Sequence, residues 1–447
     1  MRWLEARVPA ASAQSLAVFR IVFGGALLAY VLSNPVDAEW IHLAVPESVF
    51  HRMALQLYTS APPIADWIQP WLLCWTTLFM AGAMARMSFA MMTAGVVAWG
   101  LLYTMRVGAH SVQILLVVMP CLLVSRWGDA WSVDGWLRRR RASDPAGTGM
   151  PLPYGRVYGY SMWVPGLVIG VSYAAAALAK LREGGLGWIT NGTVKYHFLS
   201  DSPQAPLDWG LQVAQHEGLA VLLSFVAIAI EGLVLVGVCS VRYRYRLAAG
   251  VATLALLAGF KVFQGIFWPA WAMMLLSFLP WHVIGASTPP REAVPETPAP
   301  RSALRWAQAA IVLLVAGQQV VASALRLEAA PFISAYDMYS STYTSPADYE
   351  AKAGMTYWIV AGRIDGTAEP CKVSRADAEL VAAPRAGAAL AESDGAMRII
   401  EHCFRAGPSI RTLSIEGRRR SVDWARWRFG ADVSVPLAGP VPLEPIR

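Results

Sequence analysis

Several apolar segments of about 17–23 residues constrain the fold of this chain more than any other feature. About 20 apolar residues in a helix can cross the hydrocarbon core of a bilayer. Charged residues make up only 15% of the sequence, which argues against a soluble enzyme. We therefore predict an all-α polytopic membrane bundle of about nine transmembrane helices: Ser15–Leu32, Trp67–Met84, Ser88–Met105, Ser111–Val124, Tyr158–Ala179, Leu219–Val238, Leu247–Phe263, Ile266–Ile284 and Ala303–Ala324.

Basic residues in the short connections fall on one side of this predicted bundle. The side carries Arg126, the run Arg138–Arg141, Arg156, Arg86 and the trio Arg242, Arg244 and Arg246. Under the positive-inside rule it is cytoplasmic, and the N-terminus joins it. An odd number of helices then places the C-terminal tail in the periplasm. The net charge of +7 therefore indicates membrane topology, and we expect no nucleic-acid partner.

The predicted bundle divides into a transmembrane domain, residues 1–286, and a final transmembrane helix, residues 303–325, joined by a Pro-rich cytoplasmic linker, residues 287–302. The seventh and eighth predicted helices meet around Gln264 and Gly265, which indicates either a tight hairpin or one broken helix. This organisation is typical of a polytopic integral membrane protein.

The polar tail, residues 326–447, is predicted to form a small α+β extracytoplasmic domain, with strands at Thr356–Ile364 and Ile410–Ile415 and a short helix between them. In an oxidising compartment Cys371 and Cys403 can form a disulfide, and the alternative is two unpaired thiols. The motif Trp424–Arg428 mixes aromatic and basic residues. We interpret it as a solvated face, with contact to lipid headgroups or RNA as the alternatives.

Lys180 is the main candidate for chemistry, because it ends a long apolar segment on the predicted outer side. Removal from water disfavours the charged form of a lysine, and a neutral amine is a general base for a weak acid such as a phenol. His110 begins the preceding predicted helix on the same side and could assist. The alternative is that Lys180 only anchors the helix at the lipid headgroups.

Three further ionisable residues lie inside predicted helices: Arg20, Glu231 and Lys261. An unpaired charge in hydrocarbon is costly, so each needs a partner. A mutual pair between Arg20 and Glu231 is one solution, and we expect Glu231 to have a structural role.

Three motifs in one order resemble the vitamin K-dependent gamma-glutamyl carboxylase and its bacterial relatives, the proteins with a horizontally transferred transmembrane (HTTM) domain. The motifs are Leu16-Ala-Val-Phe-Arg20-Ile-Val-Phe-Gly24, the run from His110-Ser to Trp131-Ser-Val-Asp-Gly135, and Tyr173 through Ala-Lys180-Leu to Trp188 and Gly192. The similarity extends from about Ser15 to Trp281 and does not reach the tail.

The resemblance implies an active site at the outer end of the bundle, where Lys180 deprotonates a reduced quinone with help from His110. It implies a vitamin K hydroquinone or menaquinol-like molecule, epoxidation with O2 and coupled addition of CO2 to a periplasmic protein or peptide. We expect Arg20, Tyr173 and Trp188 to bind the quinone. The alternative function is a non-catalytic membrane scaffold, or a lipid- or quinone-binding protein whose periplasmic tail binds a partner.

Overall fold

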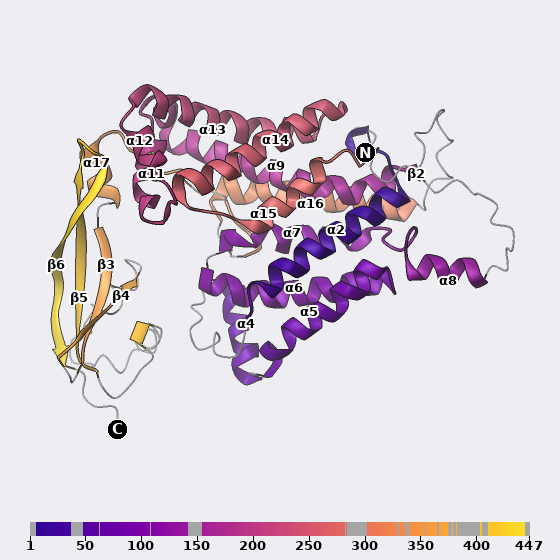
Figure 1. Cartoon of the computed structure of the whole chain (residues 1–447), viewed down its shortest axis with the longest axis horizontal. Coiled ribbons are helices and arrows are strands. Elements are labelled where there is room, and N and C mark those ends of the chain that lie inside the picture. Colours follow the sequence, from indigo (N-terminus) through magenta and orange to yellow (C-terminus); the bar gives the residue numbers. More distant parts are fainter. Residues whose placement is uncertain are drawn as a thin grey trace.

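The computed structural model of the chain is a helical membrane bundle with a small C-terminal sheet at one end (Figure 1). It describes residues 6–36, 48–61, 63–107, 109–141, 154–281, 283, 302–327, 329, 331–335, 339–353, 355–363, 366–373, 378, 381, 403–404 and 410–442. Among these residues, six helices are long and apolar enough to span a membrane: α2 (Ala13–Leu32), α6 (Ala85–Val107), α9 (Arg156–Gly184), α13 (Glu217–Val238), α14 (Tyr243–Gly259, continued by a π-helical turn, Phe260–Gln264) and α16 (Ser302–Leu325). The protein is therefore an integral membrane protein whose exposed apolar side chains contact lipid.

The other three predicted spans correspond to shorter or less apolar helices in the described part of the chain. Trp67–Met84 is matched by α5 (Pro63–Ala81), in which three tryptophans and an internal proline, Pro70, lower the hydropathy. The fourth and eighth predicted helices become α7 (Gln113–Cys121) and α15 (Pro269–Met274), each extended by a short 3₁₀ turn. The structure thus supports six spans, and nine remains a prediction.

The remaining helices are short and were not predicted from hydropathy. They lie at the two ends of the bundle or between its long helices: α4 (Val49–Ser60), α8 (Val133–Arg141), α10 (Gly187–Thr190), α11 (Val194–Asp201), α12 (Trp209–Ala214) and α17 (Pro346–Ala353). A two-residue strand β1 (Ala11–Ser12) pairs with β2 (Tyr154–Gly155) beside the start of α9. The arginine-rich α8 and the C-terminal sheet lie at opposite ends of the bundle (Figure 1).

The junction between the seventh and eighth predicted helices is the tight hairpin, because residues on its two sides meet: a Cβ at Gly250 would lie 2.5 Å from the Phe278 Cβ, and the Tyr243 hydroxyl donates to the Phe278 carbonyl at 3.2 Å. The π-helical turn ends at Gly265, whose backbone is left-handed with φ of 75°. A side chain there would be strained, and its Cβ would lie only 2.0 Å from the Gln204 carbonyl oxygen. Glycine therefore lets the chain turn tightly against the 3₁₀ turn that follows α11.

The C-terminal domain is a four-stranded antiparallel sheet of order β4-β3-β5-β6. Its strands are β3 (Met355–Arg363), β4 (Ala368–Val373), β5 (Ile410–Asp423) and β6 (Arg428–Pro442). Ile359, Ala361, Leu413 and Ile415 alternate with outward residues and form a small core with Phe404. The predicted strands are confirmed, whereas the helix expected between them and the linker at 287–302 lie almost entirely outside the described residues.

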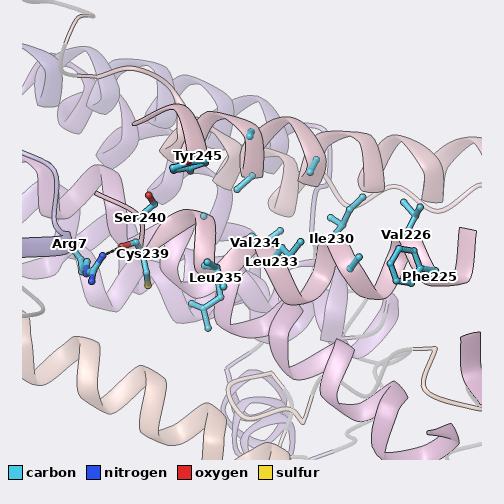
Figure 2. Close-up of a pocket in the computed structure, with 16 residues that line it drawn as sticks. Arg7, Phe225, Val226, Ile230, Leu233, Val234, Leu235, Cys239, Ser240 and Tyr245 are labelled. Carbon is cyan, nitrogen blue, oxygen red and sulfur yellow. Dashed lines mark hydrogen bonds between the residues drawn. The ribbon is translucent and has the colours of Figure 1, made fainter. Parts of the chain in front are cut away.

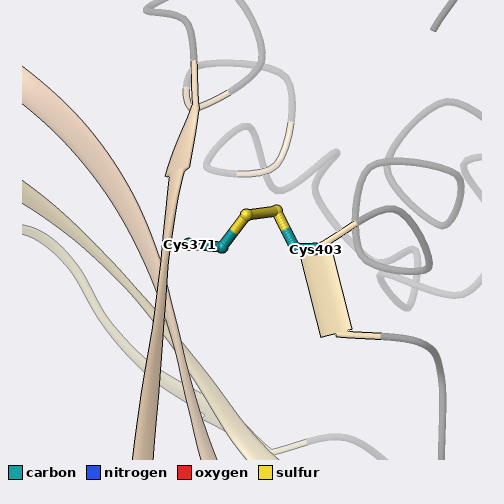
Figure 3. The surroundings of a disulfide bond; sticks show 2 residues. All are labelled: Cys371 and Cys403. Atoms are coloured by element: carbon teal, nitrogen blue, oxygen red, sulfur yellow. A yellow bond between two sulfur atoms is a disulfide. The ribbon is translucent and has the colours of Figure 1, made fainter. Parts of the chain in front are cut away.

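Cys371 of β4 and Cys403 form a disulfide (Figure 3). This confirms the predicted bridge. It closes a loop with a sequence separation of 32, and in the chain-entropy model such a closure stabilises the folded domain by about 3–4 kcal/mol. The cross-link adds to the stability of a domain whose own core is small.

The prediction that Trp424–Arg428 forms a solvated face is wrong for its aromatic residues. The motif forms the turn between β5 and β6, and Trp424 and Trp427 pack on Tyr196 of α11 with ring centroids 6.2 Å and 5.3 Å apart. The last residue of the motif, Arg428, pairs with Asp208 at 2.7 Å. Burying the two tryptophan rings is favourable even though the motif also carries exposed basic residues. The hairpin therefore holds the sheet against the bundle through these aromatic contacts.

Candidate functional site

The helix α9 presents Lys180 toward α13, because small residues let these two helices pack closely. A Cβ at Gly170 would lie 3.0 Å from the Leu235 Cα, and the stretch Ala174–Ala177 is also small. About three turns after Gly170 along α9, Lys180 Nζ donates to both carboxylate oxygens of Glu231, at 2.9 Å each. Both residues are only 3% exposed.

This geometry differs from the anchoring alternative, in which the Lys180 ammonium would reach the lipid headgroups. It also answers the partner question for Glu231, since the proposed Arg20–Glu231 pair does not form and Lys180 takes that place. A buried ion pair contributes little net stability, but removing one partner strands a charge and costs about 3–5 kcal/mol. Loss of either partner is therefore strongly destabilising, although the intact pair adds little to the free energy of unfolding. Stability alone does not account for the pair.

The Lys180–Glu231 pair opens onto an apolar cavity of about 160 Å³. Its walls come from α9, α10, α11, α13, α14 and the tail, and are mostly aromatic or aliphatic: Trp188, Val194, His197, Phe198, Leu223, Val226, Ala227, Ile230, Ala255, Leu256, Gly259, Phe260, Phe263, Gln264 and Tyr339. Trp188, expected to bind the quinone, is on this wall, with its ring 5.6 Å from Lys180 Nζ. We call this hollow the Lys180 cavity.

Tyr339 of the C-terminal tail closes one side of the Lys180 cavity. Its ring stacks on Phe260 at 5.9 Å, and its backbone carbonyl accepts a hydrogen bond from Trp188 Nε1 at 3.0 Å. The tail is therefore part of the cavity wall, although it lies outside the region of the resemblance.

His197 of α11 faces the same cavity and was not predicted as a site residue. Its ring packs edge-on against Tyr339 at 5.1 Å, and Nε2 lies 3.2 Å from the Ser341 carbonyl oxygen. Burial, followed by the positive charge of Lys180, lowers the His197 pKa to about 4. The imidazole is therefore neutral at neutral pH.

A second polar group adjoins the Lys180 cavity at the end of α11. Asp201 accepts a hydrogen bond from Gln264 Nε2 at 2.9 Å, and burial raises its pKa to about 6. The other amide atom of Gln264, Oε1, is buried without a hydrogen-bond partner, and Gln264 is on the cavity wall. The cavity thus offers an unused acceptor in addition to the Lys180–Glu231 pair.

The structure does not bring His110 to the wall of the Lys180 cavity. His110 lies in a 3₁₀ turn, Ala109–Ser111, and its backbone carbonyl accepts from Trp271 Nε1 at 2.9 Å. Trp271 in turn packs against Tyr173, with ring centroids 5.3 Å apart. Tyr173 is buried and does not line the cavity. His110 and Tyr173 therefore both contact Trp271 outside the cavity wall and do not face a ligand in the cavity.

Arg20 lies in a different region from the Lys180 cavity. Its Nη1 donates to the Trp127 carbonyl at 2.6 Å, and Nη2 donates to the Trp131 carbonyl at 2.5 Å. Just beyond that loop, in the first turn of α8, both carboxylate oxygens of Asp134 accept backbone amides at the start of α6, at 2.8 Å each. The first two resemblance motifs therefore meet in a structural junction, and Arg20 is not on the wall of the Lys180 cavity.

Lys261, the third ionisable residue predicted inside a helix, is exposed on the π-helical turn, and Nζ lies 3.5 Å from the Gly265 carbonyl. It does not enter the Lys180 cavity. One signal could have indicated His197: it and His216 are the two histidines between Lys180 and the next long apolar segment, so both must lie near the same end of the bundle. Tyr339 and Gln264 carry no such signal.

No family model, curated protein or solved structure matches this chain.

Proposed function

We propose that this protein is an integral membrane enzyme, similar to the vitamin K-dependent carboxylase and HTTM proteins, that binds a reduced quinone in the Lys180 cavity and removes a phenolic proton. One observation carries the proposal. A buried lysine–carboxylate pair opens onto an apolar, aromatic-lined cavity within the bundle. Buried ionisable groups of membrane helices that face a cavity are typical of functional sites.

The size and lining of the Lys180 cavity fit one aromatic ring. An apolar protein cavity of roughly 150 Å³ is known to bind benzene, and this one measures about 160 Å³. Trp188 and Phe260 offer ring faces, and Gln264 Oε1 offers an acceptor for a hydroxyl group. A bicyclic naphthoquinol needs more room, which a shift of Tyr339 would supply.

Lys180 and Glu231 accept a proton as a unit. If the pair begins as ammonium and carboxylate, the incoming proton ends on Glu231, and if it begins as amine and carboxylic acid, the proton ends on Lys180. Both routes give an ammonium beside a neutral carboxylic acid. The resulting positive charge faces the cavity and stabilises a phenolate there, because the low dielectric of the site strengthens their attraction.

The neighbouring aromatic groups keep this proton transfer away from water. His197 is neutral, so it does not compete with the positive charge of Lys180. Trp188 lies against the ammonium, and the tail contributes Tyr339 as a cover. Exclusion of water strengthens each electrostatic interaction inside the cavity.

The remaining parts of the proposal rest on the resemblance and on charge bias. Reaction of the quinol with O2, addition of CO2 and a protein or peptide substrate follow from the resemblance. The basic helix α8 and the tail lie at opposite ends of the bundle, which supports a cytoplasmic α8 and a periplasmic tail in a bacterial inner membrane. His110 then supports the site through Trp271 and Tyr173.

A quinol-epoxidation assay on the purified full-length protein tests this function. Wild-type protein should consume O2 and form quinone epoxide, whereas Lys180→Ala should be inactive and Glu231→Gln should lose about 100-fold or more, because each change removes one member of the proton-accepting pair. Arg139→Gln, an exposed change on α8, is the control and should match wild type. Equal activity of wild type and Lys180→Ala would overturn the proposed role.

A further inference from the structure

A long apolar groove lies between α13 and α14 on the outside of the bundle (Figure 2). It encloses about 870 Å³ and is lined mainly by aliphatic side chains, including Ile230, Leu233 and Val236. Phe225 and Val226 mark one end, and Arg7, Ser240 and Tyr245 mark the other (Figure 2). We call it the α13–α14 groove.

Close contact of the two helices at one end and small side chains along the middle create this groove. A Cβ at Gly237 would lie 2.5 Å from the Ala249 Cβ, so the helices touch there. Beyond this point Ala229, Ala248 and Ala252 leave the floor open. From Phe225 to Cys239 the helix rises about 21 Å, longer than the roughly 15 Å of one leaflet. One extended hydrocarbon chain therefore fits along it.

The end of the groove at Arg7 is strongly cationic. Arg7 Nη1 donates to the Cys239 carbonyl at 3.2 Å, and the Arg7 carbonyl accepts from Arg246. The Arg244 guanidinium stacks on Tyr245, 4.9 Å from the ring centroid. Among the residues described, Arg242, Arg244 and Arg246 form no ion pair with an acidic side chain. An anion bound at this end would balance their charge.

We propose that the α13–α14 groove binds an anionic glycerophospholipid, with one acyl chain along the groove and the phosphate near Arg7 and Arg244. The apolar length selects a hydrocarbon chain, and the cationic end selects a negative headgroup. The competing occupant is the uncharged tail of a quinone, because Val226 and Ile230 line both the groove and the Lys180 cavity. A quinone tail would bring no negative charge to Arg242 and Arg244 at that end. The lipid site does not depend on the quinol function.

Native mass spectrometry of the delipidated full-length protein tests this site. Phosphatidylglycerol and phosphatidylcholine with identical acyl chains are titrated separately, and the occupancy of the first bound lipid is compared. Wild type should prefer phosphatidylglycerol by about tenfold or more, since its headgroup has a net negative charge that the arginines attract, whereas the choline cation of phosphatidylcholine cancels that charge. The double change Arg7→Gln and Arg244→Gln should abolish this preference, whereas Arg139→Gln should keep it.

Filling the groove gives an independent second test. Ala229→Phe and Ala252→Phe should reduce binding of both lipids, and Ala258→Phe, at an exposed alanine of α14 outside the groove, should not. The arginine variants keep the proposal testable if a filled variant does not fold. Equal occupancy by the two lipids in wild type, or displacement of phosphatidylglycerol by an equimolar uncharged prenyl quinone, would overturn the lipid assignment.

Discussion

Arg20 and Lys180 are both buried cations in long apolar helices, yet their surroundings differ completely. Arg20 donates to backbone carbonyls of the loop Trp127–Trp131. Gly82 makes room for it, since a Cβ there would lie 2.8 Å from the Arg20 Nη1 atom. Lys180 instead pairs with one side chain, Glu231, and faces a cavity.

The difference separates a structural cation from a candidate catalytic one. Backbone carbonyls do not take up protons, so the Arg20 junction can only tie loop to helix. A carboxylate and an amine can exchange and accept a proton, and a cavity gives access to a ligand. The free-energy cost of burying a cation is common to Arg20 and Lys180 and does not distinguish them. The chemical group that each cation contacts does.

The largest expected difference between the two regions is in activity. Glu231→Gln removes the carboxylate from the proton-accepting unit, so we expect quinol turnover per folded molecule to fall by about 100-fold or more. Arg20→Lys weakens the junction without touching the cavity, and its turnover per folded molecule should stay close to wild type. Steady-state kinetics on monodisperse fractions measure both variants. Similar losses of turnover in Glu231→Gln and Arg20→Lys would contradict the assignment of different roles to the two regions.

The next largest effect is on stability and on its rescue. Lys180→Met strands the Glu231 charge and should lower the free energy of unfolding by about 3–5 kcal/mol, while the double change Lys180→Met and Glu231→Leu should recover most of this loss. Arg20→Met leaves several backbone carbonyls without a donor and should cost at least about 2 kcal/mol.

No single side-chain change can rescue Arg20→Met, because its partners belong to the backbone. Thermal unfolding in detergent, or unfolding in a denaturant series, measures all three variants against wild type. If the double variant is no more stable than Lys180→Met, the stability lost in Lys180→Met does not come from the unpaired Glu231 charge.

A smaller effect concerns pH, because the Lys180 region contains titratable neighbours. The ordinary pKa of histidine is 6.5 and that of buried His197 is about 4, so between these values only the unfolded state binds the proton. Stability should therefore fall as pH drops through this window. The Asp201 pKa is raised from 3.8 to about 6, and its contribution has the opposite sign, since the folded state keeps the proton.

The two variants His197→Phe and Asp201→Asn separate these contributions. Relative to wild type, His197→Phe should lose less stability between pH 7 and pH 5, and Asp201→Asn should lose more. Thermal unfolding at the two pH values measures this, and slopes that move in the same direction would be inconsistent with the assigned burial.

The smallest effect compares two buried polar groups near the ion pair. Gln264 is on the cavity wall, and Gln264→Met should weaken binding of a phenol by about 2–12-fold, the value of one hydrogen bond. The Tyr173 hydroxyl is buried without a hydrogen-bond partner behind the wall, so Tyr173→Phe should leave binding unchanged and slightly stabilise the protein. Calorimetric titration with a phenol distinguishes the two.

Much of the bundle could be predicted from sequence because hydropathy is a local property. The prediction Ser15–Leu32 differs from the observed Ala13–Leu32 by only two residues at its start. Trp67–Met84 shows the limit, because tryptophan and internal proline weaken a hydropathy signal in a helix that nevertheless forms. The disulfide between Cys371 and Cys403 could also be predicted, since they are the only cysteines in the polar tail.

The site could be predicted only in part, because partners depend on packing between distant segments. Lys180 and Glu231 were each identified as costly buried charges, but their pairing depends on the close approach of α9 and α13 at Gly170. Tyr339 reaches the cavity through a tail whose placement depends on aromatic contacts with α11. His110 is predicted from membrane topology, which places it at the same end of the bundle as Lys180. Topology does not determine which side chains at that end line the cavity.

Spectroscopy of a bound phenol tests the central claim most directly, because a redox-stable phenol isolates proton transfer from reaction with oxygen. A monocyclic phenol whose phenolate absorbs at longer wavelength is titrated into the purified protein at pH 7. Wild type should show the phenolate band on binding, about three pH units below the usual ionisation of a phenol near pH 10. Lys180→Met with Glu231→Leu should bind the phenol without that band. A wild-type spectrum showing only the neutral phenol would contradict the assignment of Lys180 and Glu231 as the base.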